Sequence, residues 1–206
     1  HVSRIHYAIE REAPLPVMVA PEPDAVYRQI AEYAAQLVSD GDTLQLGVGP
    51  VGTAMREALR QHRHLGIHSE VIGDGVMELF REGVIDNSRK TLLPGKVVAS
   101  QALGSRPLYA FLDNNPHFDF RPTDFTNNPL NIARNDRMVC LNGALLSDLG
   151  GQVVVDFLQG QFRSGVGSMV DFVRGAAMSR HGRPLIALPS TGTDAEGRRF
   201  SLIVSE

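Results

Sequence analysis

The segment TLQLGVGPVG, residues 43–52, combines two local patterns within ten residues. Residues 43–46 form a short strand-like run, and glycines at 47, 49 and 52 follow with the G-x-G-x-x-G spacing. A periodic apolar pattern over residues 53–64 then predicts a helix. Strand, glycine turn and helix in this order indicate one unit of a layered α/β domain, with backbone N–H groups placed to approach an anion.

The same alternation extends in both directions from this unit. Capping residues Asp24 and Asn128 begin two of the helices, the second with proline at its first helical position. The expected helices are 24–40, 53–64, 74–82, 106–113, one beginning at 128–129, and 168–178; the expected strands are 43–46, 65–71, 97–100, 138–141, 152–155, 185–188 and 201–204. The runs at 138–141 and 152–155 are continuously apolar, which is typical of strands buried on both faces. We therefore expect an α/β fold with a mostly parallel sheet flanked by helices in Rossmann-like layers.

Residues 1–23 hold four prolines and no sustained period, and they are expected to form a lead-in or interdomain linker. Residues 24–206 are expected to form one domain. The chain begins at His1 without methionine and stops in strand-like sequence, so we interpret it as a piece of a longer protein.

Composition excludes several classes of function. Of the 206 residues, 43% are hydrophobic and 21% are charged. The formal net charge is −3, so the sequence lacks the excess of basic residues that binds nucleic acid or an anionic membrane. No apolar run approaches the length of a membrane span, and no leader is evident. The single cysteine, Cys140, excludes a disulfide framework and a multi-cysteine metal site, and fits a reducing, cytoplasmic location.

The glycine loop allows two interpretations on spacing alone. Glu70 follows Gly52 by 18 residues near the end of the next predicted strand, where a dinucleotide-binding protein would hold a ribose hydroxyl. Pro50, however, lacks an N–H group that a phosphate would need, and the glycines equally suit a tight turn between strand and helix.

A second glycine turn, SGVGS at residues 164–168, also precedes a predicted helix. Two such loops favour a long phosphate-bearing ligand over one tight turn, although this second loop can also be a turn alone.

Ten stretches carry a resemblance to a known family. They are LQLGVG (44–49), LGIHSE (65–70) with DG (74–75), RKT (89–91) with PGK (94–96), GSR (104–106), DNNP (113–116), ARND (133–136), GGQV (150–153), SGVG (164–167), VDFVRGA (170–176) and IALPST (186–191). In this order they cover nearly the whole chain. The chain resembles the C-terminal catalytic domain of the acetyl-CoA hydrolase/transferase family, which includes the 4-hydroxybutyrate, butyrate and acetate CoA-transferases.

The resemblance implies a CoA-transferase that moves CoA between an acyl-CoA and a short-chain carboxylate through a glutamyl-CoA thioester. Glu70 matches the family nucleophile, and Asn142 matches an asparagine used near it. CoA is a substrate, and no tightly bound cofactor or metal is expected. The matching CoA-contacting residues are Gly47, Val48, Gly49, Pro50, Val51, Gly165, Val166, Gly167 and Arg180.

Further implications concern partners. The family carries another α/β domain before the proline-rich segment, with the active site between the domains. This chain is therefore expected to require that N-terminal domain as a partner, to form homo-oligomers, and to bind neither nucleic acid nor membrane.

Two departures from the family pattern concern the substrate. Leu146 stands where an acidic residue is usual, and Ser168-Met169 stands where Gly-Gln is usual. Both would make an acyl or pantetheine pocket more apolar, which favours a short- or medium-chain acyl group over acetate alone.

Other residues admit a functional and a structural interpretation. His68 shares a strand face with Glu70 and could tune its carboxylate, or be a hydrogen-bonded structural residue. His62 and His64 have no ligand-spaced partners, and a helix C-terminus explains them. Asn142 could be a turn residue before Gly143, and Arg180 could be a solvated loop residue.

Three alternative functions remain open at this point. The first is an acetyl-CoA hydrolase, if water reaches the thioester. The second is a nicotinamide-dependent oxidoreductase built on the loop at residues 47–52. The third is a CoA-binding module without catalysis.

Overall fold

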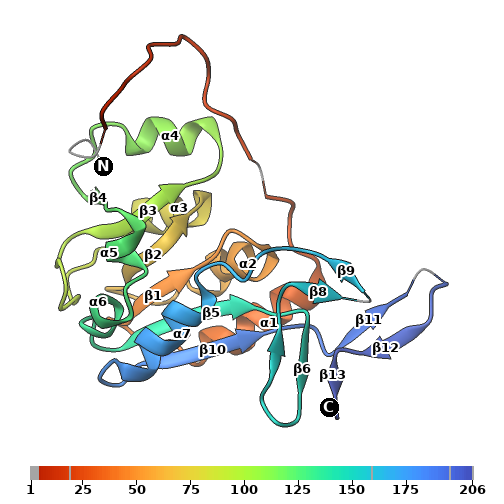
Figure 1. The fold of residues 1–206 in the computed structure, drawn as a ribbon. Helices are drawn as coiled ribbons and strands as arrows, with labels where there is room; N and C mark the ends of the chain where they lie inside the picture. Colours follow the sequence, from red (N-terminus) through yellow and green to blue (C-terminus); the bar gives the residue numbers. More distant parts are fainter. Residues whose placement is uncertain (1–4, 19, 159, 195, 206) are drawn as a thin grey trace.

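A parallel β-sheet forms the centre of the computed structural model, which describes residues 5–18, 20–158, 160–194 and 196–205 (Figure 1). Within these residues the sheet has six strands in the order β10-β5-β1-β2-β3-β4, all parallel. Their bounds are β1 (Thr43–Leu46), β2 (Gly66–Ile72), β3 (Val97–Ala102), β4 (Phe118–Phe120), β5 (Met138–Gly143) and β10 (Arg183–Ala187). The expected α/β class with a mostly parallel sheet is confirmed.

Helices cover both faces of the sheet. One layer holds α1 (Ala25–Ala35), α2 (Pro50–Ala58), α3 (Asp74–Arg81) and α4 (Arg106–Leu112), and the other holds α5 (Thr123–Thr126), α6 (Pro129–Ala133) and α7 (Met169–Met178). Two caps form as expected: Asp24 accepts from the Tyr27 N–H at 3.0 Å, and Asn128 accepts from the Leu130 N–H at 2.9 Å. These caps start α1 and α6 because they satisfy N–H groups that a first turn leaves unpaired.

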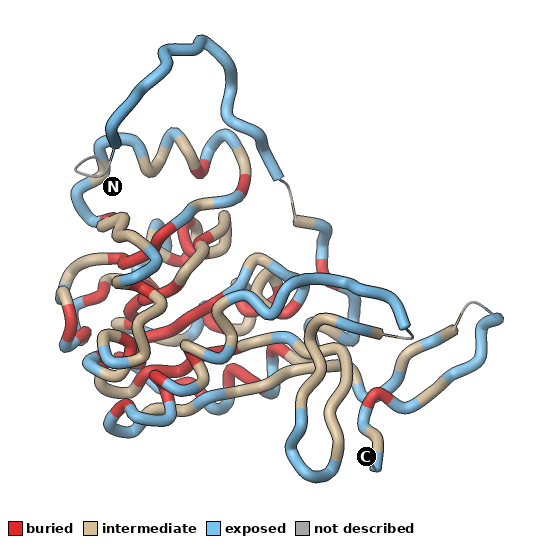
Figure 2. The backbone as a smooth tube through the Cα atoms, in the orientation of Figure 1, coloured by how far each residue is buried: buried red, intermediate tan, exposed pale blue. Residues whose placement is uncertain are grey.

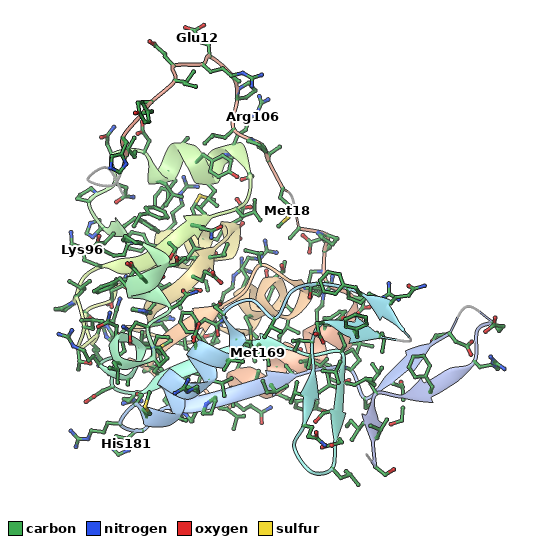
Figure 3. The ribbon with its side chains drawn as sticks, viewed as in Figure 1. Glu12, Met18, Lys96, Arg106, Met169 and His181 are labelled. Carbon is green, nitrogen blue, oxygen red and sulfur yellow. The ribbon has the colours of Figure 1, made fainter. Side chains whose placement is uncertain are left out.

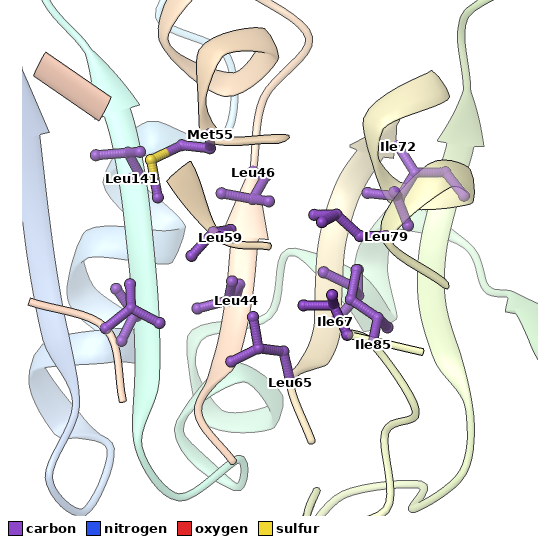
Figure 4. Packing of buried hydrophobic residues seen from close by; sticks show 14 of the residues in the cluster. Leu44, Leu46, Met55, Leu59, Leu65, Ile67, Ile72, Leu79, Ile85 and Leu141 are labelled. Atoms are coloured by element: carbon purple, nitrogen blue, oxygen red, sulfur yellow. The ribbon is translucent and has the colours of Figure 1, made fainter. Parts of the chain in front are cut away.

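The hydrophobic core lies on both faces of the central strands, which are the most continuously buried part of the tube in Figure 2. On the first face, leucine and isoleucine side chains of β1 and β2 pack against α2 and α3 (Figure 4). On the second face, Met138 and Cys140 pack against Ile132, Phe172 and Ala176 of α6 and α7. Alternate residues of one strand therefore face different helical layers.

The order of the strands in the sheet reverses between β1 and β5. Strands β1 to β4 follow one another towards one edge of the sheet, and β5 then pairs with the other side of β1. In open α/β sheets, ligands bind outside the carboxyl ends of strands at such a switch point. The topology therefore directs attention to the ends of β1, β2 and β5.

Smaller sheets extend beyond the carboxyl end of the central one. They are β13-β6-β7, made of β6 (Leu146–Asp148), β7 (Val153–Val154) and β13 (Ile203–Val204); the β8 (Phe157–Leu158) and β9 (Gln161–Phe162) pair; and the β11 (Thr191–Thr193) and β12 (Arg199–Ser201) pair. These segments are mostly half-buried or exposed.

Two strand predictions were wrong in detail. The segment 152–155 is not a strand buried on both faces: it contributes β7, which folds back antiparallel to β6 because a glycine turn, with Gly151 at φ +89°, precedes it. The segment 201–204 is not one strand, since the Ser201 hydroxyl bonds to the Ile203 backbone and the chain bends between β12 and β13. The helix predicted at 53–64 begins earlier, at Pro50, and ends at Ala58.

The predicted linker at residues 1–23 has no helix or strand where it is described; residues 1–4 and 19 lie outside the described residues, as do 159, 195 and 206 of the predicted domain. Among the described helices, none is long and apolar enough to cross a membrane.

Candidate active site

A cavity of about 280 Å³ lies at the carboxyl ends of β1, β2 and β5. Its lining includes Glu70, Asn142, Gly47 and Val48, together with Gly165, Val166 and Gly167. The structure therefore brings the predicted nucleophile, the predicted asparagine and both glycine loops to one place. This place is the switch point of the sheet.

Strand register explains why these residues meet. Leu44 pairs with Ile67 on β2, and Leu46 pairs with Leu141 on β5. Continuing the β1–β5 register one residue past β1 places Gly47 level with Asn142, and Glu70 of β2 lines the same cavity. A Cβ atom at Gly47 would meet only the Gly49 nitrogen, at 4.0 Å. The missing side chain thus leaves open space beside Asn142.

The Glu70 carboxylate is half-buried, and within the described chain no hydrogen bond or ion pair engages it. An unpaired carboxylate at a cavity wall keeps its lone pairs available for a ligand. The Glu70 side chain is therefore open to a ligand that enters the cavity.

Gln45 is a site residue that the sequence analysis missed. It is buried in β1, lines the cavity, and its Oε1 accepts from the Asn142 Nδ2 at 3.2 Å. The contact orients the two amides beside each other, so that further N–H groups remain for a ligand. The feature that could have revealed Gln45 is a polar residue within a four-residue strand that is buried along its whole length.

His68 has the structural role and does not pair with Glu70. Its Nε2 lies 2.8 Å from the Thr126 carbonyl oxygen, and its ring contacts Phe125 and Phe172. Burial lowers the pKa of His68 to about 4. The imidazole is therefore neutral near pH 7 and donates to Thr126, which ties α5 to β2.

Residues of the first glycine loop line two neighbouring cavities. Gly49 is the N-cap of α2, and with Pro50 and Val51 it lines a second cavity of about 270 Å³. Gly47 lines both cavities, so they meet at this residue. Gly52 packs so closely under the loop that a Cβ atom there would lie 1.9 Å from the Gly47 carbonyl oxygen.

The second glycine loop lies across the cavity from the sheet and leads directly into α7. Gly167 adopts φ +61°, a left-handed conformation that glycine tolerates best. Met169, the first residue of α7, lines the cavity, whereas Leu146 does not. The expected apolar effect on the pocket is therefore supported by position for Met169 alone.

The structure does not bring Arg180 to the cavity. Its carbonyl oxygen accepts from the Arg137 N–H at 2.7 Å, just before β5 begins, whereas Asn142 lies near the end of that strand. The Arg180 side chain is exposed and lies 3.9 Å from Asp136. Arg180 thus belongs to the amino edge of the sheet, opposite the site.

The remaining candidates have structural surroundings. His64 pairs with Asp86 at 2.7 Å, and His62 contacts the Val38 carbonyl at 3.2 Å. No group of three or more metal-ligand side chains occurs in the described part of the chain. Cys140 is buried, and burial raises the pKa of its thiol to about 11, so it is a packed core residue.

Comparison with known proteins identifies relatives of the whole chain. Residues 104–206 match the model of the acetyl-CoA hydrolase/transferase C-terminal domain. The 4-hydroxybutyrate coenzyme A transferase of Clostridium kluyveri is 46% identical over 201 residues, covering 98% of this chain and 47% of the relative. The succinyl-CoA:cyclohexane-1-carboxylate CoA transferase of Geobacter metallireducens is 39% identical, covering 93% of this chain and 44% of its own. The chain therefore spans about half the length of the curated relatives it matches.

Solved structures agree with this match. The 4-hydroxybutyrate CoA-transferase of Porphyromonas gingivalis superposes with a TM-score of 0.85 at 40% identity, covering 100% of this chain and 48% of that protein. The two chains thus share a fold over all of the present sequence.

Proposed function

Because the chain belongs to the acetyl-CoA hydrolase/transferase family, we propose that it carries the nucleophile of an acyl-CoA:carboxylate CoA-transferase. One observation carries the proposal most directly: the unpaired Glu70 carboxylate stands at the switch-point cavity that Gly47 and Asn142 also line. The relatives named as CoA transferases support the same reaction class.

The proposed reaction has two half-steps. A Glu70 carboxylate oxygen attacks the thioester carbonyl, the C–S bond breaks, and CoA thiolate leaves behind an acyl–glutamyl anhydride. The thiolate then attacks the Glu70 carbonyl carbon, the anhydride C–O bond breaks, and the acyl group departs as a carboxylate. Glutamyl-CoA remains, and an incoming carboxylate reverses the sequence. No general base is required because a glutamate is ordinarily ionised near pH 7.

Each attack places negative charge on a carbonyl oxygen, and hydrogen-bond donors are needed to stabilise that charge. The amides of Asn142 and Gln45 are held together at the cavity, and backbone N–H groups of both glycine loops border it. Preorganised donors of this kind stabilise a developing oxyanion without reorganising. We assign the oxyanion role to this set and the nucleophile to Glu70.

CoA enters the proposal as a substrate and needs room for its pantetheine arm. The second cavity, bordered by Gly49, Pro50 and Val51, joins the first at Gly47 and suits that arm. A small carboxylate is the other substrate. We also propose that the rest of a longer protein supplies the wall facing Glu70, because the relatives are about twice as long as this chain.

The decisive experiment is intact mass measurement of the complete protein after incubation with butyryl-CoA. The wild type is expected to gain a covalent CoA adduct that borohydride reduces, and Glu70→Gln is expected to gain none. Glu32→Gln, at an exposed position of α1, is the matched control and should keep the adduct. An adduct that survives in Glu70→Gln would overturn the assignment.

The same preparation separates the alternatives. CoA release without an acceptor carboxylate would indicate a hydrolase, since water would then reach the thioester. CoA binding without an adduct would indicate a binding module. Preferential binding of NADH, followed by fluorescence, would indicate a nicotinamide-dependent enzyme.

A further inference from the structure

The cavity around Glu70 is bordered by polar side chains of the sheet and by two apolar side chains of the segment that leads into α7. Gln45, Glu70 and Asn142 present amides and a carboxylate from the edge of the sheet. Val166 and Met169 line the cavity from the other segment, beside the backbone of the second glycine loop. A substrate at Glu70 therefore meets polar side chains of the sheet, while this other segment offers it the apolar side chains of Val166 and Met169.

Helix geometry places Met169 level with Glu70. Phe172 of α7 contacts His68 of β2, with ring centroids 6.1 Å apart. Met169 lies one turn before Phe172, about 5 Å nearer the carboxyl edge of the sheet. Glu70 lies two residues after His68 on β2, about 7 Å nearer that edge. Both side chains therefore line the same cavity.

Met169 is positioned by a fixed helix. Phe172 and Ala176 of α7 are fully buried against the sheet. Gly175 sits against Ile132 so closely that a Cβ atom would lie 2.5 Å from its side chain. Met169, at the start of this helix (Figure 3), is therefore held over the cavity by packing farther along α7.

Two serines lie near Met169 in the cavity lining. The Ser164 hydroxyl donates to the Val155 carbonyl at 3.1 Å, whereas Ser168, at the N-cap of α7, makes no capping hydrogen bond through its side chain. Met169 contributes the largest side chain of this segment to the cavity, and its thioether is at most a weak acceptor.

We propose that Met169 is a specificity residue that selects acyl groups with an apolar chain over isosteric groups ending in a hydroxyl. This rests on the proposed function, since the acyl chain must extend from the carbonyl that Glu70 attacks towards the opposite side. A hydroxyl placed against Met169 and Val166 loses water and gains no strong hydrogen-bond partner from either side chain. An alkyl chain there gains burial and packs against an adaptable side chain.

Butyrate and 3-hydroxypropionate test the proposal because they differ only in a terminal methyl or hydroxyl group. With the complete enzyme and acetyl-CoA as donor, kcat/KM is expected to favour butyrate by about 10- to 100-fold. Met169→Gln is nearly isosteric and adds an amide, and it should lower that ratio at least fivefold. Met169→Leu should keep it. Met178→Gln, the same change at the exposed far end of α7, is the matched control.

An unchanged ratio in Met169→Gln would overturn the proposal. If Met169→Gln proves inactive, the series acetate, propionate and butyrate replaces it: wild type should gain about fourfold per methylene, and Met169→Ala should lose most of that gain. A gain that Met169→Ala retains also overturns the proposal. The adduct at Glu70 is read separately, so its absence would refute the proposed function, whereas an adduct with unchanged selectivity refutes only the role of Met169.

Discussion

Replacing Gly52 with alanine perturbs the site through backbone geometry alone. A Cβ atom at Gly52 would lie 1.9 Å from the Gly47 carbonyl oxygen and 2.7 Å from its carbonyl carbon. Real Cβ atoms do not approach closer than 3.0 Å, so the contact must open by about 1 Å. Because the obstructing atoms are backbone, no side-chain rotation relieves the clash, and the loop at 47–52 must move.

The size of the effect follows from this displacement. Overpacking of this kind costs about 1–3 kcal/mol, and alanine's better helix propensity returns up to about 1 kcal/mol. We expect Gly52→Ala to lower the free energy of unfolding by about 1–2 kcal/mol. Gly47 borders the cavity beside Glu70, and a shift of about 1 Å in a positioning element costs on the order of 100-fold in rate.

Urea unfolding and steady-state kinetics of the complete enzyme measure the two effects. Gly49→Ala is the control in the same loop: its φ is −76°, and a Cβ atom there meets nothing within 4 Å. This variant should stay within about 1 kcal/mol of wild type in urea unfolding. If Gly52→Ala unfolds at the wild-type midpoint and turns over normally, the close packing under Gly47 does not position the site.

Three further predictions concern charge and stability. The pKa of His68 is about 4 in the folded protein, below its ordinary value in the unfolded chain, so the unfolded chain binds more protons as pH falls. The free energy of unfolding should therefore fall by about 3 kcal/mol between pH 6.5 and pH 4. His68→Phe should flatten that pH dependence in urea unfolding. Asp42 is buried between two arginines, so Asp42→Asn should cost about 3 kcal/mol in urea unfolding. Asp136 is only half-buried and lies 3.9 Å from exposed Arg180, so Asp136→Asn should cost less than about 0.5 kcal/mol. Arg180→Ala should leave the KM for acyl-CoA unchanged; a severalfold rise would return Arg180 to the site.

Local signals predicted most of the central fold. Buried strands such as β5 begin as short apolar runs, and the caps at Asp24 and Asn128 mark helix starts, because these features depend on neighbouring residues alone. β4 was missed because its three residues are too few to establish an alternating pattern. The peripheral strands were misassigned because apolar runs such as 152–155 do not specify a partner strand.

The sequence predicted which residues belong to the candidate site better than it predicted how they are arranged. The resemblance pointed to Glu70 and Asn142, but only the folded arrangement of the strands shows that Gly47 lines one cavity with both of them. Arg180 was misplaced because a residue between a crossover helix and the next parallel strand belongs to the amino edge of the sheet. That rule follows from topology, which the spacing of residues does not contain.

The return of β5 to the side of β1 also has a consequence for folding kinetics. Leu46 and its partner Leu141 are far apart in the chain, so their pairing must overcome the entropy of closing a long loop. A partly folded chain with β1 to β4 in place would hold Gly47 and Glu70 yet lack Asn142. Recovery of activity during refolding should therefore lag behind recovery of helical circular dichroism, because the last strands to dock complete the set of residues to which we assign catalysis.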